Sequence, residues 1–275
     1  MAEEEFDPVI ARLQFGELAR GLREAARIDF GEADKVLGDY LGKLSKIENG
    51  VIAPRPQDVE AMIELYEASS SVADQLRELG TAARRRAAPA KTVSGSRQYV
   101  SLERLASKIH MVYNEVPGLL QTEEFATAAL SRSLTVAAAD VPGMARERAE
   151  RGKRIIRPGG PDVWIALGED ALGRKFGNRD VLRRQLEHLR DVSRMSNVHL
   201  RVLTLDVGGV PGLSCPFTLL YVPPKRTLAY VASLTRTDYI KATGPYNAAF
   251  DQAWELASSE EESGAILDDR IADLT

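Results

Sequence analysis

The first third of the chain carries apolar residues at helical spacing in short, separate runs. One run lies at residues 14–28, where apolar side chains recur every three or four positions (Phe15, Leu18, Leu22 and Ala25). Further helices are expected over residues 32–37, 42–48, 57–68 and 72–86. Prolines in the loop at 51–56 prevent the third helix from running into the fourth. This pattern predicts an all-α unit built from short helices.

A linker and a second, mixed region are predicted to follow. Residues 87–98 (AAPAKTVSGSRQ) are rich in small residues and cannot bury enough apolar area to order firmly. Beyond them, helices are expected at 102–110, 122–133, 144–155, 179–194 and 245–257, and from Ser259 onward. Strands are expected at 163–167, 198–205, 217–222, 227–234 and 238–242. The mixture predicts an α+β domain with a mainly antiparallel sheet.

Length and composition fit two globular domains. The chain has 275 residues, of which 44% are hydrophobic and 28% charged. We expect the all-α unit at 1–80, a linker at 81–98 and the α+β domain at 99–275. The acidic start and the lack of an apolar run of about 20 residues predict a cytoplasmic protein without a membrane segment. The single cysteine, Cys215, excludes an internal disulfide and is expected to be buried.

Residues 28–50 (IDFGEADKVLGDYLGKLSKIENG) carry the most specific local signal. Two short helices joined at Gly38 would let the second project into a DNA major groove, which is about 12 Å wide. Leu37, Leu44 and Ile47 are expected to pack this second helix onto the first. The other face is expected to meet double-stranded DNA through Tyr40, Lys43, Ser45, Lys46 and Asn49. Of these, Lys43 and Lys46 are expected at phosphates or guanine edges.

This stretch resembles the helix-turn-helix of the phage-repressor-like, xenobiotic-response-element (XRE) family of regulators. The resemblance is carried by residues 44–50, together with Glu32, Leu37 and Gly38. It implies a sequence-specific transcriptional regulator, which we expect to act as a homodimer; an ordinary helical hairpin is the structural alternative. The family usually has a small alanine where this chain has Asp34, so this carboxylate must be solvated or paired.

The charge of the same region argues against strong DNA binding. The whole chain has a net charge of −4. Its first 68 residues contain eight basic and fifteen acidic residues. Because neutralised phosphates supply most of the affinity for DNA, an acidic reading unit is a handicap. The alternative function is therefore a repurposed regulator scaffold that no longer binds DNA and acts as an enzyme of specialised metabolism or a protein-binding module.

A second distinctive segment lies at residues 112–130 (VYNEVPGLLQTEEFATAAL). It predicts a strand, a Pro-Gly turn and a helix capped by Thr122. It resembles the signature of an uncharacterised domain that follows such helix-turn-helix units in many actinobacterial regulators, and the resemblance extends from about residue 98 to the end. Those regulators are similar to antitoxin-like factors, which implies a small acidic partner protein. We also expect a pocket for a small-molecule effector, lined by Tyr113, Glu115, Gln121, Phe217 and Tyr239.

No sequence motif predicts catalysis, a metal or a cofactor. The three histidines, His110, His188 and His199, lack metal-ligand spacing. The sequence contains no Gly-rich phosphate loop and no nucleophile elbow. His110, Phe250 and Trp254 are therefore expected to pack inside the protein.

Overall fold

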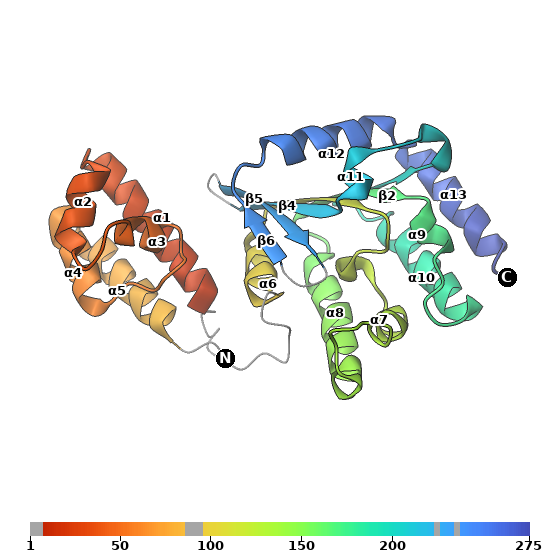
Figure 1. Ribbon diagram of the computed structural model, residues 1–275, viewed down its shortest axis with the longest axis horizontal. Helices are drawn as coiled ribbons and strands as arrows, with labels where there is room; N and C mark the ends of the chain where they lie inside the picture. The colour runs from red at the N-terminus through yellow and green to blue at the C-terminus, as the bar shows by residue number, and fades with distance from the viewer. Residues whose placement is uncertain (1–7, 86–95, 223–225, 234–236) are drawn as a thin grey trace. The chain divides into compact units, whose positions relative to one another are not determined.

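The chain forms two compact units, Met1–Ala90 and Lys91–Thr275 (Figure 1). The computed structural model describes residues 8–85, 96–222, 226–233 and 237–275. The acidic residues 1–7 and most of the predicted linker lie outside this described part. Helix α5 ends at Arg84 and α6 begins at Ser96, so helices occupy both ends of the segment 81–98. No helix in the described residues is long and apolar enough to span a membrane.

The N-terminal unit is all-α within residues 8–85, as predicted. Its helices are α1 (Pro8–Ala25), α2 (Phe30–Leu37), α3 (Lys43–Glu48), α4 (Pro56–Leu65) and α5 (Ser70–Arg84). Asp29 caps the start of α2 by accepting hydrogen bonds from the amides of Gly31 and Glu32. Gly38 ends α2 as expected, with a φ of 59° that favours glycine.

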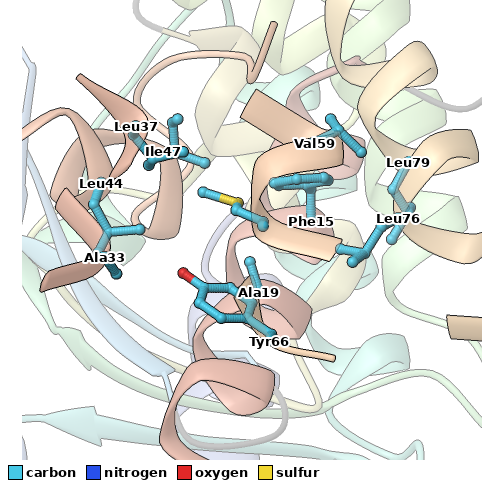
Figure 2. Packing of buried hydrophobic residues seen from close by; sticks show 11 residues of the cluster. Phe15, Ala19, Ala33, Leu37, Leu44, Ile47, Val59, Tyr66, Leu76 and Leu79 are labelled. Carbon is cyan, nitrogen blue, oxygen red and sulfur yellow. The ribbon is translucent and has the colours of Figure 1, made fainter. Parts of the chain in front are cut away.

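The core of this unit joins all five helices through apolar side chains. Figure 2 shows Phe15 and Ala19 of α1 among buried residues contributed by α2 to α5 and by the residue that follows α4: Ala33, Leu37, Leu44, Ile47, Val59, Tyr66, Leu76 and Leu79. Gly16 lets α1 approach the end of α3 closely, because a Cβ there would lie 2.5 Å from the carbonyl oxygen of Ile47. The backbone of α3 is thus supported directly by α1.

The C-terminal unit is built on a six-stranded mixed sheet with the order β3-β2-β1-β4-β5-β6. The strands are β1 (Lys108–Tyr113), β2 (Asp162–Gly168), β3 (Val198–Leu203), β4 (Phe217–Val222), β5 (Arg226–Ala232) and β6 (Thr237–Ile240). The β1/β2 and β2/β3 pairs are parallel, and the other three pairs are antiparallel. Helical crossovers join the parallel strands, as such connections require.

Helices cover both faces of this sheet. Figure 1 shows α12 (Gly244–Leu256) on one side, and α6 (Ser96–Leu105), α8 (Val141–Ile155) and α10 (Arg179–Val192) on the other. The remaining helical segments are η1 (Gly118–Leu120), α7 (Glu123–Leu130), η2 (Ala138–Asp140), α9 (Asp170–Gly173), η3 (Leu205–Val207), α11 (Pro211–Ser214) and α13 (Glu260–Ala272). Thr122 caps α7, and Ser259 with Glu262 forms the predicted capping box of α13.

The α12 side contains the expected aromatic core. His110 of β1 stacks on Phe250, with ring centroids 3.9 Å apart, and Phe250 stacks on Trp254. The Nδ1 atom of His110 lies 3.3 Å from the hydroxyl of Tyr221, which donates to Asn247 Oδ1 at 2.6 Å. The prediction that His110, Phe250 and Trp254 pack inside the protein is confirmed.

Two local predictions are wrong. The helix expected over residues 102–110 ends at Leu105, and Lys108 to His110 begin β1. Apolar residues in this segment fit a helical period, but pairing with both β2 and β4 satisfies the backbone of residues 108–110 as a central strand. Cys215 is exposed rather than buried, because it follows α11 and precedes β4 instead of lying within the sheet.

Candidate nucleic-acid interface

The turn between α2 and α3 sets the position of the second helix. Gly38, Asp39 and Gly42 all have positive φ angles, so the chain turns sharply within the five residues between α2 and α3. This tight turn leaves Leu41 96% exposed and Tyr40 45% exposed, shortly before α3. The N-terminal end of α3 thus presents an apolar and an aromatic side chain to solvent.

Asp34 holds the start of α3 in place. Its carboxylate oxygens accept hydrogen bonds from the backbone amides of Gly42, at 2.7 Å, and Leu44, at 2.8 Å. Gly42 is the N-cap residue of α3 and Leu44 belongs to its first turn, where amides have no partner within the helix. The Asp34 carboxylate is therefore paired, and it caps the second helix from within the first.

Lys43 does not lie on the outer face of α3, where the sequence placed it. Its side chain is 3% exposed, and its Nζ donates to Asp58 Oδ1 at 2.6 Å, to Asp39 Oδ2 at 2.5 Å and to the carbonyl of Leu37 at 3.1 Å. Burial alone would lower the pKa of Lys43, but the bonds to Asp39 and Asp58 outweigh it and raise the pKa. Lys43 therefore stays charged and binds partners inside the protein. The prediction that it contacts DNA is corrected accordingly.

The Asp58 carboxylate is the centre of this internal network. It also accepts from the amide of Arg55 at 2.9 Å, and the guanidinium of Arg55 bonds to Asp39. Burial would raise the pKa of Asp58, yet the hydrogen bonds from Lys43 and Arg55 lower it overall. The network ties the turn before α3 to the start of α4.

The C-terminal end of α3 is fixed by α1. Buried Glu48 accepts from Arg23 Nε at 2.7 Å and pairs with Arg20 Nε at 3.3 Å. Arg20 also donates to Asn49 Oδ1 at 3.1 Å, while Asn49 Nδ2 bonds the carbonyl of Ser45 at 2.7 Å. Asn49 and Ser45 are partly exposed, so Asn49 supports the helix end as well as bordering its outer face.

Lys46 is the lysine of α3 that faces outward. Its side chain is exposed, and its Nζ lies 4.7 Å from the centre of the Tyr40 ring. Together with Leu41 and the partly exposed Ser45, these residues form what we call the outer face of α3: Tyr40, Leu41, Ser45 and Lys46. The sequence analysis missed Leu41, whose one signal is that a large apolar residue occurs in an otherwise polar turn.

The five residues expected to line an effector pocket do not all lie together. Phe217 packs on the α12 side of the sheet, where its ring centroid lies 5.1 Å from that of Tyr246. Glu115 is exposed, and its Oε1 pairs with the guanidinium of Arg174 at 3.0 Å. Tyr113, Gln121 and Tyr239, in contrast, belong to the α6 and α8 side. That grouping includes Arg148 and Arg151, from a stretch (residues 146–154) that the sequence alone predicts to be a solvated helix face; the prediction is wrong for Arg151, whose side chain is 13% exposed.

Comparison with known families agrees with this division of the chain. A helix-turn-helix domain model matches residues 14–79. The N-terminal unit is accordingly a helix-turn-helix domain, the class of fold that inserts a helix into DNA. Residues 96–269 match the family described as domain of unknown function DUF5753, and the protein belongs to that family. No curated protein and no solved structure matches the chain.

Proposed function

We propose that this protein is a cytoplasmic, DNA-binding transcriptional regulator that acts as a homodimer. The observation that carries the proposal is the helix-turn-helix domain, in which α3 is held by α1, α2 and α4 and its outer face makes no ion pair with the described residues. The C-terminal unit would bind a small-molecule effector or a small acidic partner protein. Such a ligand changes DNA affinity only if it favours one of two states of the protein.

Each residue on the outer face of α3 would contact a different group of the DNA. Lys46 supplies the cation for a phosphate or a guanine edge, and Ser45 supplies a hydroxyl for a base or a phosphate. Leu41 has no polar atom in its side chain, so its complementary group is the methyl of thymine. Tyr40 orients Lys46 through its ring and offers a hydroxyl to the backbone.

The electrostatic part of this binding would be small. Arg20, Arg23, Lys43 and Arg55 form ion pairs within the N-terminal unit and leave little charge for phosphates. Affinity for DNA falls with salt by a slope of about −0.9 for each phosphate neutralised. We therefore expect weak nonspecific binding that is visible mainly at low salt.

The test is retardation of promoter DNA from the protein's own and neighbouring genes, measured over a range of salt. Lys46→Gln should weaken specific binding about tenfold and reduce the salt slope by about 1 per bound unit. The matched control is Lys175→Gln, which removes an exposed lysine from the C-terminal unit and should leave binding unchanged. Equal retardation by Lys46→Gln and the native protein would contradict the assignment.

A repurposed scaffold is the second candidate, and the inward position of Lys43 favours it. Helix α3 has two lysines, and the burial of Lys43 leaves Lys46 as the one that can contact DNA. Absence of any binding to random duplex DNA at low salt would support this candidate over a regulator.

A further inference from the structure

A row of polar and aromatic side chains crosses the α6 and α8 side of the sheet. The backbone register places Thr218 of β4 opposite Tyr230 of β5, and Tyr230 opposite Tyr239 of β6. The hydroxyl of Tyr113 lies 3.0 Å from Thr218 Oγ1, which extends the row to β1. Tyr99 of α6 packs over Tyr230 with ring centroids 4.3 Å apart. The face therefore presents phenol rings and hydroxyls instead of a purely aliphatic surface.

Charged side chains from α6 and α8 lie among these tyrosines. Glu103 is 0% exposed and pairs with Arg151 Nε at 3.3 Å; the Arg151 side chain is 13% exposed. The Arg151 guanidinium lies 5.7 Å from the Tyr99 ring centre. Arg148, one turn earlier on α8, donates to Gln121 Oε1 at 2.9 Å. We call this set the arginine–tyrosine cluster; its members are Tyr99, Glu103, Tyr113, Arg148, Arg151 and Tyr230.

The charges of the cluster do not balance among the described residues. Arg148 makes no ion pair there, and its hydrogen-bond partner is the neutral amide of Gln121. Neither oxygen of Glu103 meets a donor at good hydrogen-bond geometry in the described part of the chain, although Tyr99 lies close enough to lower the pKa of Glu103, and Arg151 Nε meets no acceptor at good geometry there. Glu147, partly exposed on the same helix, attracts both arginines at longer range, and Arg104 and Arg154 attract Glu103 in the same way. With these neighbours counted, the charged groups around the cluster carry an excess of positive charge.

The protonation states of Tyr113 and Glu103 do not remove this excess positive charge. Burial raises the pKa of Tyr113 to about 12, so this phenol is a neutral donor at pH 7. Burial also raises the pKa of Glu103, which the nearby Arg151 partly opposes. Protonation of Glu103 would only increase the excess positive charge. The group that complements the cluster is therefore an anion.

We propose that the arginine–tyrosine cluster binds a small aromatic carboxylate, with its carboxylate on Arg148 and Arg151 and its ring against Tyr99 and Tyr230. A planar guanidinium matches the two oxygens of a carboxylate, and phenol rings pack favourably on an aromatic body. The inference deepens the proposed function, because it names the effector class of the C-terminal unit. Binding itself does not require DNA.

The direct test is titration calorimetry of the full chain with benzoate, with benzamide as the neutral analogue of the same shape. Benzoate should bind, and it should raise the melting temperature of the C-terminal unit as its concentration rises. Benzamide should bind at least tenfold more weakly. No heat and no stabilisation with benzoate, or equal binding of the two compounds, would overturn the proposal.

Two substitutions should shift benzoate affinity in opposite directions. Arg148→Met removes the unpaired cation and should weaken binding at least tenfold, whereas Glu103→Gln removes the competing carboxylate and should strengthen it several-fold. Arg146→Met is the matched control, because that side chain is 72% exposed on the same helix. Arg148→Met that binds as the native protein does, or weaker binding by folded Glu103→Gln, would refute the assignment. Because no DNA is present, this outcome is separate from that of the retardation experiment.

Discussion

At the residue scale, the interior ion pair of Lys43 decides what α3 can do. An ammonium group that is 3% exposed must find partners, and Asp58 and Asp39 supply them at 2.6 and 2.5 Å. Removal of one member of such a pair leaves the other charge buried without compensation. The role of Lys43 is therefore to position the turn and α3.

Lys43→Met should lower the free energy of unfolding of the N-terminal unit by about 3 kcal/mol, because Asp58 then lacks its main partner. Hydrogen exchange of amides in α3 and α4 measures this loss. Both tryptophans lie in the C-terminal unit, so their fluorescence would not report it. Lys35→Met, at an exposed position of α2, is the control and should change stability by less than about 0.5 kcal/mol. Unchanged exchange in Lys43→Met would show that the pair contributes nothing to stability.

The sequence identified polar residues suited to contact DNA, but it did not show which of them point outward from α3. Lys43 and Lys46 are alike in local sequence, and both suit a DNA contact. Their separation depends on Asp58, which lies fifteen residues beyond Lys43 and approaches only when α4 packs on the turn. Lys46 and Tyr40 were expected on the outer face because they are polar residues opposite the apolar positions, and neither pairs with an acid in the described part of the chain.

At the element scale, α3 has only six residues and depends on its surroundings for helical structure. Asp34 satisfies two amides at its start, Glu48 anchors its end to α1, and Gly16 allows the close approach. The element is thus determined by tertiary contacts and not by local propensity.

Asp34→Ala restores the small residue that is usual in the XRE family, yet it should destabilise this protein. The amides of Gly42 and Leu44 would lose their acceptor, at a cost of about 1–3 kcal/mol. Urea unfolding followed by circular dichroism, or hydrogen exchange at α3, measures the change. Glu32→Ala, at an exposed position on the same helix, should be nearly neutral. An equal or greater stability of Asp34→Ala would show that the cap has no energetic role.

Most elements could be predicted from hydrophobic periodicity, which identified the helices of the N-terminal unit and five of the strands. The start of β1 was missed because residues 102–109 have apolar residues at a helical period, while strand pairing across the sheet decides the outcome. The arginine–tyrosine cluster was missed for a related reason. Its members come from α6, β1, α8 and β5, and no local sequence pattern marks their charges, because only the folded sheet brings them together.

At the scale of the whole molecule, the two units should respond differently to mild acid. All three histidines lie in the C-terminal unit. Burial, with a smaller effect of Lys108, lowers the pKa of His110 to about 3, and burial also lowers the pKa of His188. In the N-terminal unit the shifted acids, Asp39, Asp58 and Glu60, have lowered pKa values, so their contribution is lost only at more acidic pH.

Lowering the pH from 7 to 5 should therefore destabilise the C-terminal unit and leave the N-terminal unit nearly unchanged. The unfolded chain takes up a proton on His110 below about pH 6.5 while the folded state does not, which costs about 2 kcal/mol at pH 5. Tryptophan fluorescence during urea unfolding follows this loss. His110→Phe keeps the stack on Phe250 and should flatten the dependence. An identical slope in that variant would assign the effect to other groups.

The residues that hold α3 in place are different from the residues that point outward from it. Asp34, Lys43 and Glu48 are committed to the protein itself, whereas Tyr40, Leu41, Ser45 and Lys46 have few internal obligations. Changes at the outward positions can accumulate without a penalty in folding. A lineage, or a randomised library, can therefore alter the operator that such a scaffold recognises while the scaffold itself is conserved.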